Sequence, residues 1–182
     1  MKPPASNFQL PNFSINCNGR LVDLNTPKIM GILNLTPDSF SDGGKFNNEK
    51  SALLHAEKLL KDGADFIDIG AQSTRPNAEY LSAEEEIRRI GNMISLIKKE
   101  FPEALISIDT FYAEVVKFGY NEGMDVVNDI SGGYFDENLL PTVAETGLPY
   151  ILMHSNTSYS TMHEKIRYED ITMSVNYYFS EK

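Results

Sequence analysis

Short apolar runs alternate with longer stretches of helical periodicity along the chain. The apolar runs predict five strands, at residues 28–33, 65–69, 104–108, 125–127 and 150–153. Apolar residues at three- and four-residue spacing predict helices at 48–62, from Ser82 to the residue before Pro102, at 112–122 and 136–145, and from about Tyr168 onward. A helix therefore follows each strand, which is the pattern of a parallel sheet with helices outside it.

Local signals indicate where some of these elements begin. The pair Asn18-Gly19 favours a two-residue type I′ turn, so residues 13–18 and 20–25 are predicted to form a hairpin before the first full strand. Ser82 and Glu85 have the spacing of a capping box, and Asp136 is expected to cap the helix that starts there.

Polar side chains stand at or near the end of all five predicted strands. They are Asn34, Asp68, Asp109, Asn128 and His154. One such residue is commonly a helix cap, but five in succession are better explained by a parallel barrel, whose strand ends converge on one catalytic face. An open doubly wound sheet would spread them along an edge, and the G-x-G-x-x-G sequence of a dinucleotide-binding fold is absent.

The predicted fold is an α/β (β/α)₈ TIM barrel, truncated here to about five βα units after an N-terminal β-hairpin. A typical barrel of this kind has about 250 residues, whereas this chain has 182. Residues 1–182 are therefore expected to be one domain that is incomplete at its C-terminal end, and inactive and poorly folded on its own because its outer sheet edges are unpaired.

Composition narrows the class of protein. Hydrophobic residues make up 41% and charged residues 23% of the chain, as in soluble globular domains. No apolar run is long enough to span a membrane, no signal-peptide core is present, and the lone Cys17 fits a reducing compartment, so a cytoplasmic location is expected. A net charge of −10 argues against nucleic acid as a partner.

The loop after Asn34 has the composition of a ligand-binding segment. Asp38, Asp42, Gly43 and Glu49 fall at positions one, five, six and twelve of a calcium-binding EF-hand loop. Phe40 at position three cannot bind a metal, and a strand rather than a helix precedes the loop. An ordinary surface turn remains an alternative, but Phe40 in mid-loop favours a lid that closes over a flat ligand.

The loop after the second predicted strand reads Gly70-Ala71-Gln72-Ser73-Thr74-Arg75-Pro76. Its small residues let the backbone approach a ligand, Thr74 offers a hydroxyl and an N–H, and Arg75 offers a planar fork suited to phosphate or carboxylate. A solvated Arg75 is the alternative. This loop leaves the same barrel face as Asn34, which favours a ligand-binding role for Arg75.

These two loops resemble the signatures of the dihydropteroate synthase family. The matching segments are LNLTPDSFSDGG (Leu33–Gly44) and GADFIDIGAQSTRP (Gly63–Pro76), with SIDT, VVND and ILMH at the next three strand ends. The likeness runs from the hairpin to about His154. The chain departs from the family at Gln72, where Glu is usual, and after Met153, where HSNTSYST replaces an MQG-like run.

The resemblance implies that 6-hydroxymethyl-7,8-dihydropterin diphosphate reacts with p-aminobenzoate to give 7,8-dihydropteroate and pyrophosphate, with Mg²⁺ as cofactor. It implies these site residues: Asn34 as the metal ligand, Asp42 and Arg75 as catalytic residues, and Thr74, Asp109, Asn128, Phe40, Pro76 and Met153 as substrate-binding residues. Thr74 would hold the diphosphate, and Asp109 and Asn128 the pterin. Arg75, Pro76, Phe40 and Asp42 would close over p-aminobenzoate.

The family's remaining binding groups, an Asp, a Lys and an Arg-x-His run, lie on later strands that this chain does not include. A non-catalytic pterin-binding fragment is therefore an alternative. A second alternative is a barrel that binds methyltetrahydrofolate for methyl transfer, although barrels of that class lack the DSFSDGG lid that this chain contains. The full-length protein is a possible homodimer, with small-molecule partners only.

Overall fold

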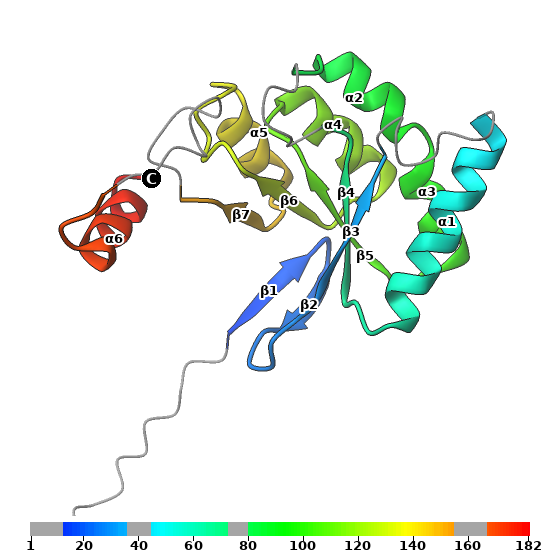
Figure 1. The fold of residues 1–182 in the computed structure, drawn as a ribbon, viewed down its shortest axis with the longest axis horizontal. Coiled ribbons are helices and arrows are strands. Elements are labelled where there is room, and N and C mark those ends of the chain that lie inside the picture. The colour runs from blue at the N-terminus through cyan, green and yellow to red at the C-terminus, as the bar shows by residue number, and fades with distance from the viewer. Residues whose placement is uncertain (1–12, 36–44, 73–79, 155–166) are drawn as a thin grey trace, which may run out of the picture.

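The computed structural model describes residues 13–35, 45–72, 80–154 and 167–182. Five parallel strands pair in sequence order: β3 (Met30–Asn34), β4 (Phe66–Gly70), β5 (Leu105–Asp109), β6 (Val126–Asp129) and β7 (Tyr150–Leu152). The helices are α1 (Lys45–Lys61), α2 (Ala83–Ile90), α3 (Met93–Glu100), α4 (Ala113–Glu122), α5 (Leu139–Thr146) and α6 (Ile171–Glu181). Helices α1 to α5 lie along one side of the sheet (Figure 1).

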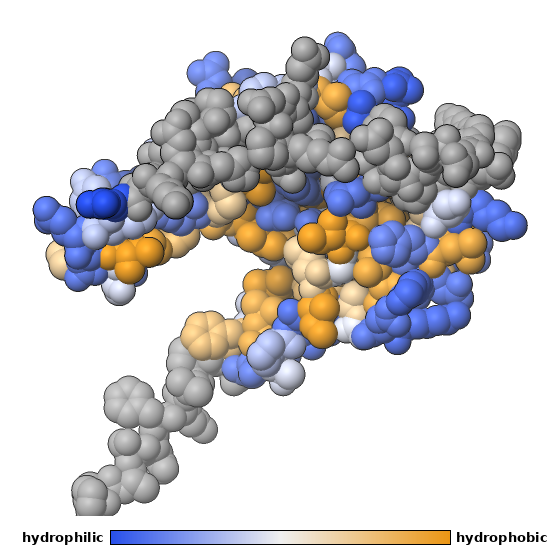
Figure 2. Space-filling model, in the orientation of Figure 1, coloured by the Kyte–Doolittle hydropathy of each residue, from blue (hydrophilic) through white to orange (hydrophobic). Residues whose placement is uncertain are grey.

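This arrangement is a contiguous part of a parallel barrel, as predicted, because sequential strands pair side by side with helices outside. Alternate strand residues face the helices, where Leu33, Ile67, Ile106 and Val127 are fully buried. The other face is the barrel interior. Its open side leaves Ile32 59% and Ile151 40% exposed, and Figure 2 shows apolar surface running from above the hairpin toward α6.

The predicted hairpin is present as β1 (Ser14–Cys17) and β2 (Arg20–Asp23). Its turn residues Asn18 and Gly19 have φ values of 50° and 89°, so both adopt the positive φ that a type I′ turn requires. Cys17 and Val22 pack against three interior residues near the strand starts, namely Phe66, Leu105 and Val126. The hairpin therefore covers the N-terminal end of the barrel, opposite the polar strand ends.

The single helix predicted from Ser82 to Pro102 is wrong, because the structure has two helices there. Gly91, at φ 53°, ends α2 and donates its N–H to the carbonyl of Ile87. One of the two hydrogen bonds of the predicted capping box is present, because the Ser82 hydroxyl accepts the N–H of Glu85 at 3.3 Å. The Glu85 carboxylate instead binds Arg88 and Arg89, on the exposed side of α2.

The expectation that Asp136 caps α5 is also wrong. Helix α5 begins at Leu139, and its N-cap residue Asn138 makes no side-chain capping bond. One carboxylate oxygen of Asp136 accepts the N–H of Asn138 at 2.9 Å, and the other accepts the N–H of Ala113 at 2.8 Å. Because Ala113 is the first residue of α4, Asp136 ties the loop after β6 to the start of the preceding helix.

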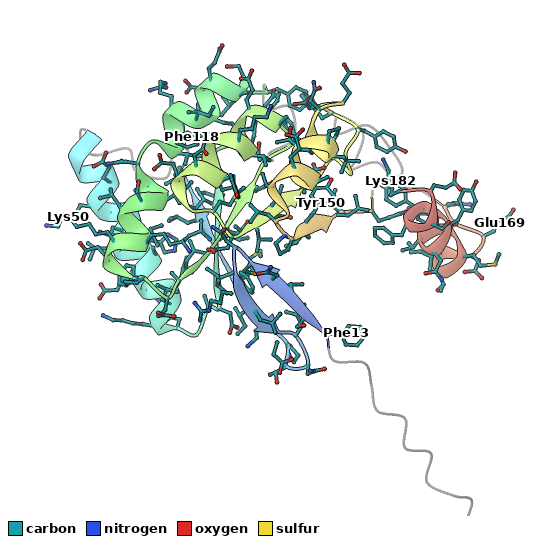
Figure 3. The ribbon with its side chains drawn as sticks, turned by 180° about the vertical axis from the view of Figure 1, so that it is seen from behind. Phe13, Lys50, Phe118, Tyr150, Glu169 and Lys182 are labelled. Atoms are coloured by element: carbon teal, nitrogen blue, oxygen red, sulfur yellow. The ribbon has the colours of Figure 1, made fainter. Side chains whose placement is uncertain are left out.

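The remaining boundaries differ from prediction by a few residues, as in α1, which begins at Lys45. Figure 3 shows Tyr150 on β7, where its hydroxyl donates to Asp129 of β6 and joins the last two strands. Among the described residues, no helix is both long and apolar enough to cross a membrane.

We expect Asp136→Ala to lower the free energy of unfolding by about 0.5–2 kcal/mol, because two backbone N–H groups lose their acceptor. Burial favours the neutral form of Asp136, but the hydrogen bonds from Ala113 and Asn138 outweigh it and hold its pKa below the ordinary value. Such a group stabilises the fold above its unfolded-state pKa of about 3.9 and loses that contribution as the pH falls.

Urea unfolding of the protein at about pH 7 and about pH 3 measures this difference. The gap between parent and Asp136→Ala should narrow at the lower pH. Glu137→Ala, at the exposed neighbouring residue, is the matched control. Equal stabilities of the two variants at neutral pH would contradict the capping role.

Candidate active site

The pairing register arranges the interior side chains in layers across the sheet. The layer nearest the strand ends contains Asn34, Gly70, Asp109, Asn128 and Ile151, which are consecutive register partners from β3 to β7. The next layer contains Ile32, Asp68, Ser107 and Val126. The prediction that Asn34, Asp109 and Asn128 share one face of the barrel is confirmed.

Gly70 leaves an open space between two of these groups. A Cβ built on Gly70 would lie 3.2 Å from Oδ1 of Asn34 and 3.8 Å from Oδ2 of Asp109. Both oxygens therefore border the same small volume, on strands that are separated by β4. A side chain at position 70 would fill the space where a ligand could meet both groups.

Asn128 is oriented by a buried acid in the layer below it. Its Nδ2 donates to Oδ2 of Asp68 at 3.1 Å. The sequence placed Asp68 near a strand end, but it lies one layer deeper, in the middle of β4. Burial raises the pKa of Asp68, and the nearby Ser107 hydroxyl and Asn128 amide offset this only in part.

The layer below the site also has unsatisfied polar atoms. Oδ1 of Asp68 and Oγ of Ser107 are both buried, and neither has a hydrogen-bond partner within the described residues. Sequence reasoning missed Ser107. The available signal was a polar residue inside a buried strand, two positions before Asp109 and therefore on the same face.

Asp109 has the electrostatic character of a binding group. Burial, together with the negative charges of Asp68, Glu86 and Asp129, raises its pKa to about 7. The alternative role as a helix cap does not hold, because the N–H groups that open α4 have other acceptors: Asp136 binds that of Ala113, and the Thr110 hydroxyl binds that of Tyr112. Perturbed carboxyls in a concave face are typical of functional sites.

The fifth strand end differs from the prediction. His154 lies beyond β7 and its ring contacts the ring of Tyr178 on α6, with centroids 4.8 Å apart. It therefore takes part in an aromatic cluster with α6 and not in the site layer. Alternation along β7 places Met153, rather than His154, on the interior face with Ile151.

The other predicted site residues, Phe40, Asp42, Thr74, Arg75 and Pro76, lie outside the described residues. The chain segments leading to them do begin at the site, since the N–H of Leu35 donates to the carbonyl of Gly70 at 2.8 Å, where both strands end.

The described residues offer little for a metal bound by protein ligands alone. No group of three or more His, Cys, Asp or Glu side chains that could hold an ion occurs among them. Asn34 instead presents an exposed carboxamide at the end of β3, bordering the space beside Gly70. A single neutral oxygen fits Mg²⁺ that retains water and phosphate ligands, which is the usual way this ion binds at phosphate sites.

Comparison with known proteins identifies the relatives. The model of the family described as pterin binding enzyme matches residues 30–182. The chain is 43% identical to the dihydropteroate synthase of Escherichia coli K12, over 90% of this chain and 57% of that protein. It is 45% identical to the mitochondrial folate synthesis bifunctional protein of Arabidopsis thaliana, over 83% of this chain and 28% of that protein.

Solved structures agree with these matches. The dihydropteroate synthase of Xanthomonas albilineans with 4-aminobenzoic acid superposes with a TM-score of 0.81 at 34% identity, covering 93% of this chain and 59% of that one. The Yersinia pestis enzyme in a sulfonamide drug complex gives 0.80 at 37% identity, covering 93% and 60%. The chain thus spans at most about three fifths of these relatives.

The raised pKa of Asp109 predicts a cost to stability. Its unfolded-state pKa is about 3.9, and the folded protein prefers the neutral acid up to about pH 7. Stability is therefore lost as the pH rises between these values. We expect Asp109→Asn to raise the free energy of unfolding above about pH 7 by about 1–3 kcal/mol, with no gain near pH 4.

Urea unfolding of the protein at several pH values tests this. The control is Glu145→Gln, a matched acid-to-amide change at an exposed position of α5, which should be neutral at every pH. A loss of stability in Asp109→Asn at alkaline pH would mean that the carboxylate is well solvated or paired.

Proposed function

Because the chain belongs to the family of pterin-binding enzymes, we propose that the protein is a dihydropteroate synthase of folate biosynthesis. It would join 6-hydroxymethyl-7,8-dihydropterin diphosphate to p-aminobenzoate and release pyrophosphate. The observation that carries the proposal is the pairing of Asp109 with Asn128 in one interior layer, beside the space left open by Gly70.

In this proposal Asp109 and Asn128 recognise the pterin. A carboxylate accepts hydrogen bonds from two adjacent N–H donors, such as the 2-amino group and a ring N–H. Asp68 holds one N–H of Asn128, so the second N–H and the carbonyl oxygen of that amide are available for the neighbouring pterin edge. Met153, which directly follows Leu152 of β7, would add an apolar contact.

Reaction would take place above this layer, at the strand ends. The bond between the pterin methylene carbon and the diphosphate oxygen breaks, and the amine of p-aminobenzoate forms a bond to that carbon and loses a proton. Thr74 would bind the leaving diphosphate, and Arg75, Phe40, Asp42 and Pro76 would enclose p-aminobenzoate. Asn34 would hold Mg²⁺, which neutralises charge on the leaving group when bound.

We also propose a cytoplasmic location, which the lone Cys17 supports, although two plant relatives are mitochondrial proteins by name. From the resemblance alone, we propose a homodimer of the full-length protein.

The direct test is an assay of dihydropteroate formation by the full-length protein with both substrates and Mg²⁺, since residues 1–182 alone are expected to be inactive. Product formation supports the proposal. Binding of a pterin analogue without product would instead indicate the non-catalytic role, and no binding of either substrate would contradict both.

Asp109→Asn should weaken binding of a pterin analogue by about 1–3 kcal/mol, because the amide can satisfy only one of two N–H donors. Binding by the parent should also weaken as the pH falls below about 7, where Asp109 takes up its proton, whereas the variant should lack this pH dependence. Isothermal titration calorimetry at several pH values measures both effects. Unchanged affinity would exclude Asp109 from the pterin site.

Asn34→Ala should lower turnover and its dependence on Mg²⁺, while binding of a pterin that lacks diphosphate stays nearly intact. Steady-state kinetics across Mg²⁺ concentrations and calorimetry with the diphosphate-free pterin separate the two effects. Asn92→Ala, at an exposed carboxamide without a side-chain capping bond, is the control. An equal loss of affinity for the diphosphate-free pterin would assign Asn34 to the fold.

A further inference from the structure

A hydrogen bond between two side chains crosses the interior face of the sheet. Asp68 lies on β4 and Asn128 on β6, with β5 between these strands. Nδ2 of Asn128 donates to Oδ2 of Asp68 at 3.1 Å, although the two residues are 60 positions apart in the chain. The register aligns Asp68 with Ser107 and Asn128 with Asp109, so the bond runs diagonally across β5 from the lower layer to the site layer.

This bond fixes the direction of the Asn128 amide. Because a carboxylate oxygen accepts hydrogen bonds and donates none, the NH₂ end of the amide faces Asp68 and the carbonyl oxygen lies at the other end. The terminal torsion of an asparagine side chain is broad and roughly two-fold, so an amide without such a partner can turn over and exchange its donor and its acceptor. Asp68 therefore determines which end of Asn128 a ligand meets.

Asp68 is a poor residue for stability at this position. It is 7% exposed, and its Oδ1 has no hydrogen-bond partner among the described residues. Burial raises its pKa, which means that the surroundings disfavour its charge. A buried acid that is incompletely paired costs folding free energy, so packing does not explain its presence. Such a conflict with stability next to a site is typical of residues that serve function.

We propose that Asp68 is a positioning residue for pterin recognition: the acceptor that it presents holds the Asn128 amide in the one orientation that matches the pterin edge. This inference rests on the proposed function, in which Asn128 binds that edge. It goes beyond the proposed function in two ways. Asp68 acts on ligand affinity only through Asn128, and its removal weakens binding without a matching loss of stability.

The first variant, Asp68→Leu, removes the acceptor and keeps a side chain of similar shape. The full-length variant should bind a diphosphate-free pterin analogue about three- to tenfold more weakly, because the freed amide must be ordered when the ligand binds. Its melting temperature should stay close to that of the parent, because removal of a buried, incompletely paired acid offsets the loss of one hydrogen bond. Isothermal titration calorimetry and thermal unfolding at neutral pH measure the two quantities.

The second variant separates hydrogen bonding from charge. Asp68→Asn keeps an oxygen for Nδ2 of Asn128, and its new N–H groups can donate to the hydroxyl oxygen of Ser107, its register partner on β5. Affinity for the analogue should therefore stay within about twofold of the parent. Asp62→Asn, a matched change at an exposed position after α1, is the control and should alter neither affinity nor melting temperature.

A double-mutant cycle tests whether Asp68 acts through Asn128. The Asn128→Ala protein has no amide to orient, and Asp109 remains to hold the analogue, so binding stays measurable. In this background Asp68→Leu should weaken binding by less than about twofold. An equal loss in both backgrounds would show that Asp68 affects the ligand without Asn128, and it would overturn the inference.

The remaining outcomes are also distinct. Weaker binding by Asp68→Leu with near-parent binding by Asp68→Asn supports the inference. Equal losses of affinity in these two variants overturn it in favour of a charge effect, and unchanged affinity in Asp68→Leu overturns it outright. A large fall in the melting temperature of Asp68→Leu also overturns it, because Asp68 would then serve the fold. Failure of the unsubstituted full-length protein to bind the analogue contradicts the proposed function instead, and is recognised before any variant is made.

Discussion

The register of the parallel sheet is the constraint on which the site depends. Hydrogen bonding aligns Asn34 with Gly70, Gly70 with Asp109, and Asp109 with Asn128. Because side chains alternate along a strand, this alignment sends these residues inward while their neighbours Leu33, Ile69 and Ile108 pack on the helices. A slip of one residue would exchange the two sets, so the apolar side chains of the outer core also hold the polar groups in place.

Negative charge is the second property of this region. Asp109 and Asp129 end β5 and β6, Asp68 lies one layer deeper in β4, and Glu86 lies on α2. Each of these acids is at least partly buried. Asp129 is satisfied by the N–H groups of Ser131 and Gly133 and by Tyr150, and Glu86 by Gln72 and Thr110. Asp68 and Asp109 are less well satisfied. Asp129 and Glu86 therefore hold loops in place, whereas Asp68 and Asp109 keep oxygens that a ligand could use.

The sequence predicts what local pattern controls. Apolar runs predicted the strands, and Asn18-Gly19 predicted the hairpin turn. The polar residues that end apolar runs predicted Asn34, Asp109 and Asn128 as site residues. Features set by contacts between distant segments were missed or misplaced. Gly91 ends α2, although the apolar spacing continues past it. Asp136 accepts an N–H at the start of α4 instead of capping the helix that follows it. The hydrogen-bond partners of Gln72 are Leu81 and Glu86, which lie farther along the chain. His154 turns toward α6 because Tyr178 offers an aromatic partner.

The hairpin at the N-terminal end of the barrel limits the directions from which the interior can be reached. Cys17 and Val22 cover the interior residues at the strand starts, so this end is filled by apolar side chains. The polar layer of Asp109 and Asn128 lies at the opposite end of the strands. Within the described residues the sheet is open beside Ile32 and Ile151, so the hairpin closes one end of the interior and leaves its polar end and its open side accessible to ligands.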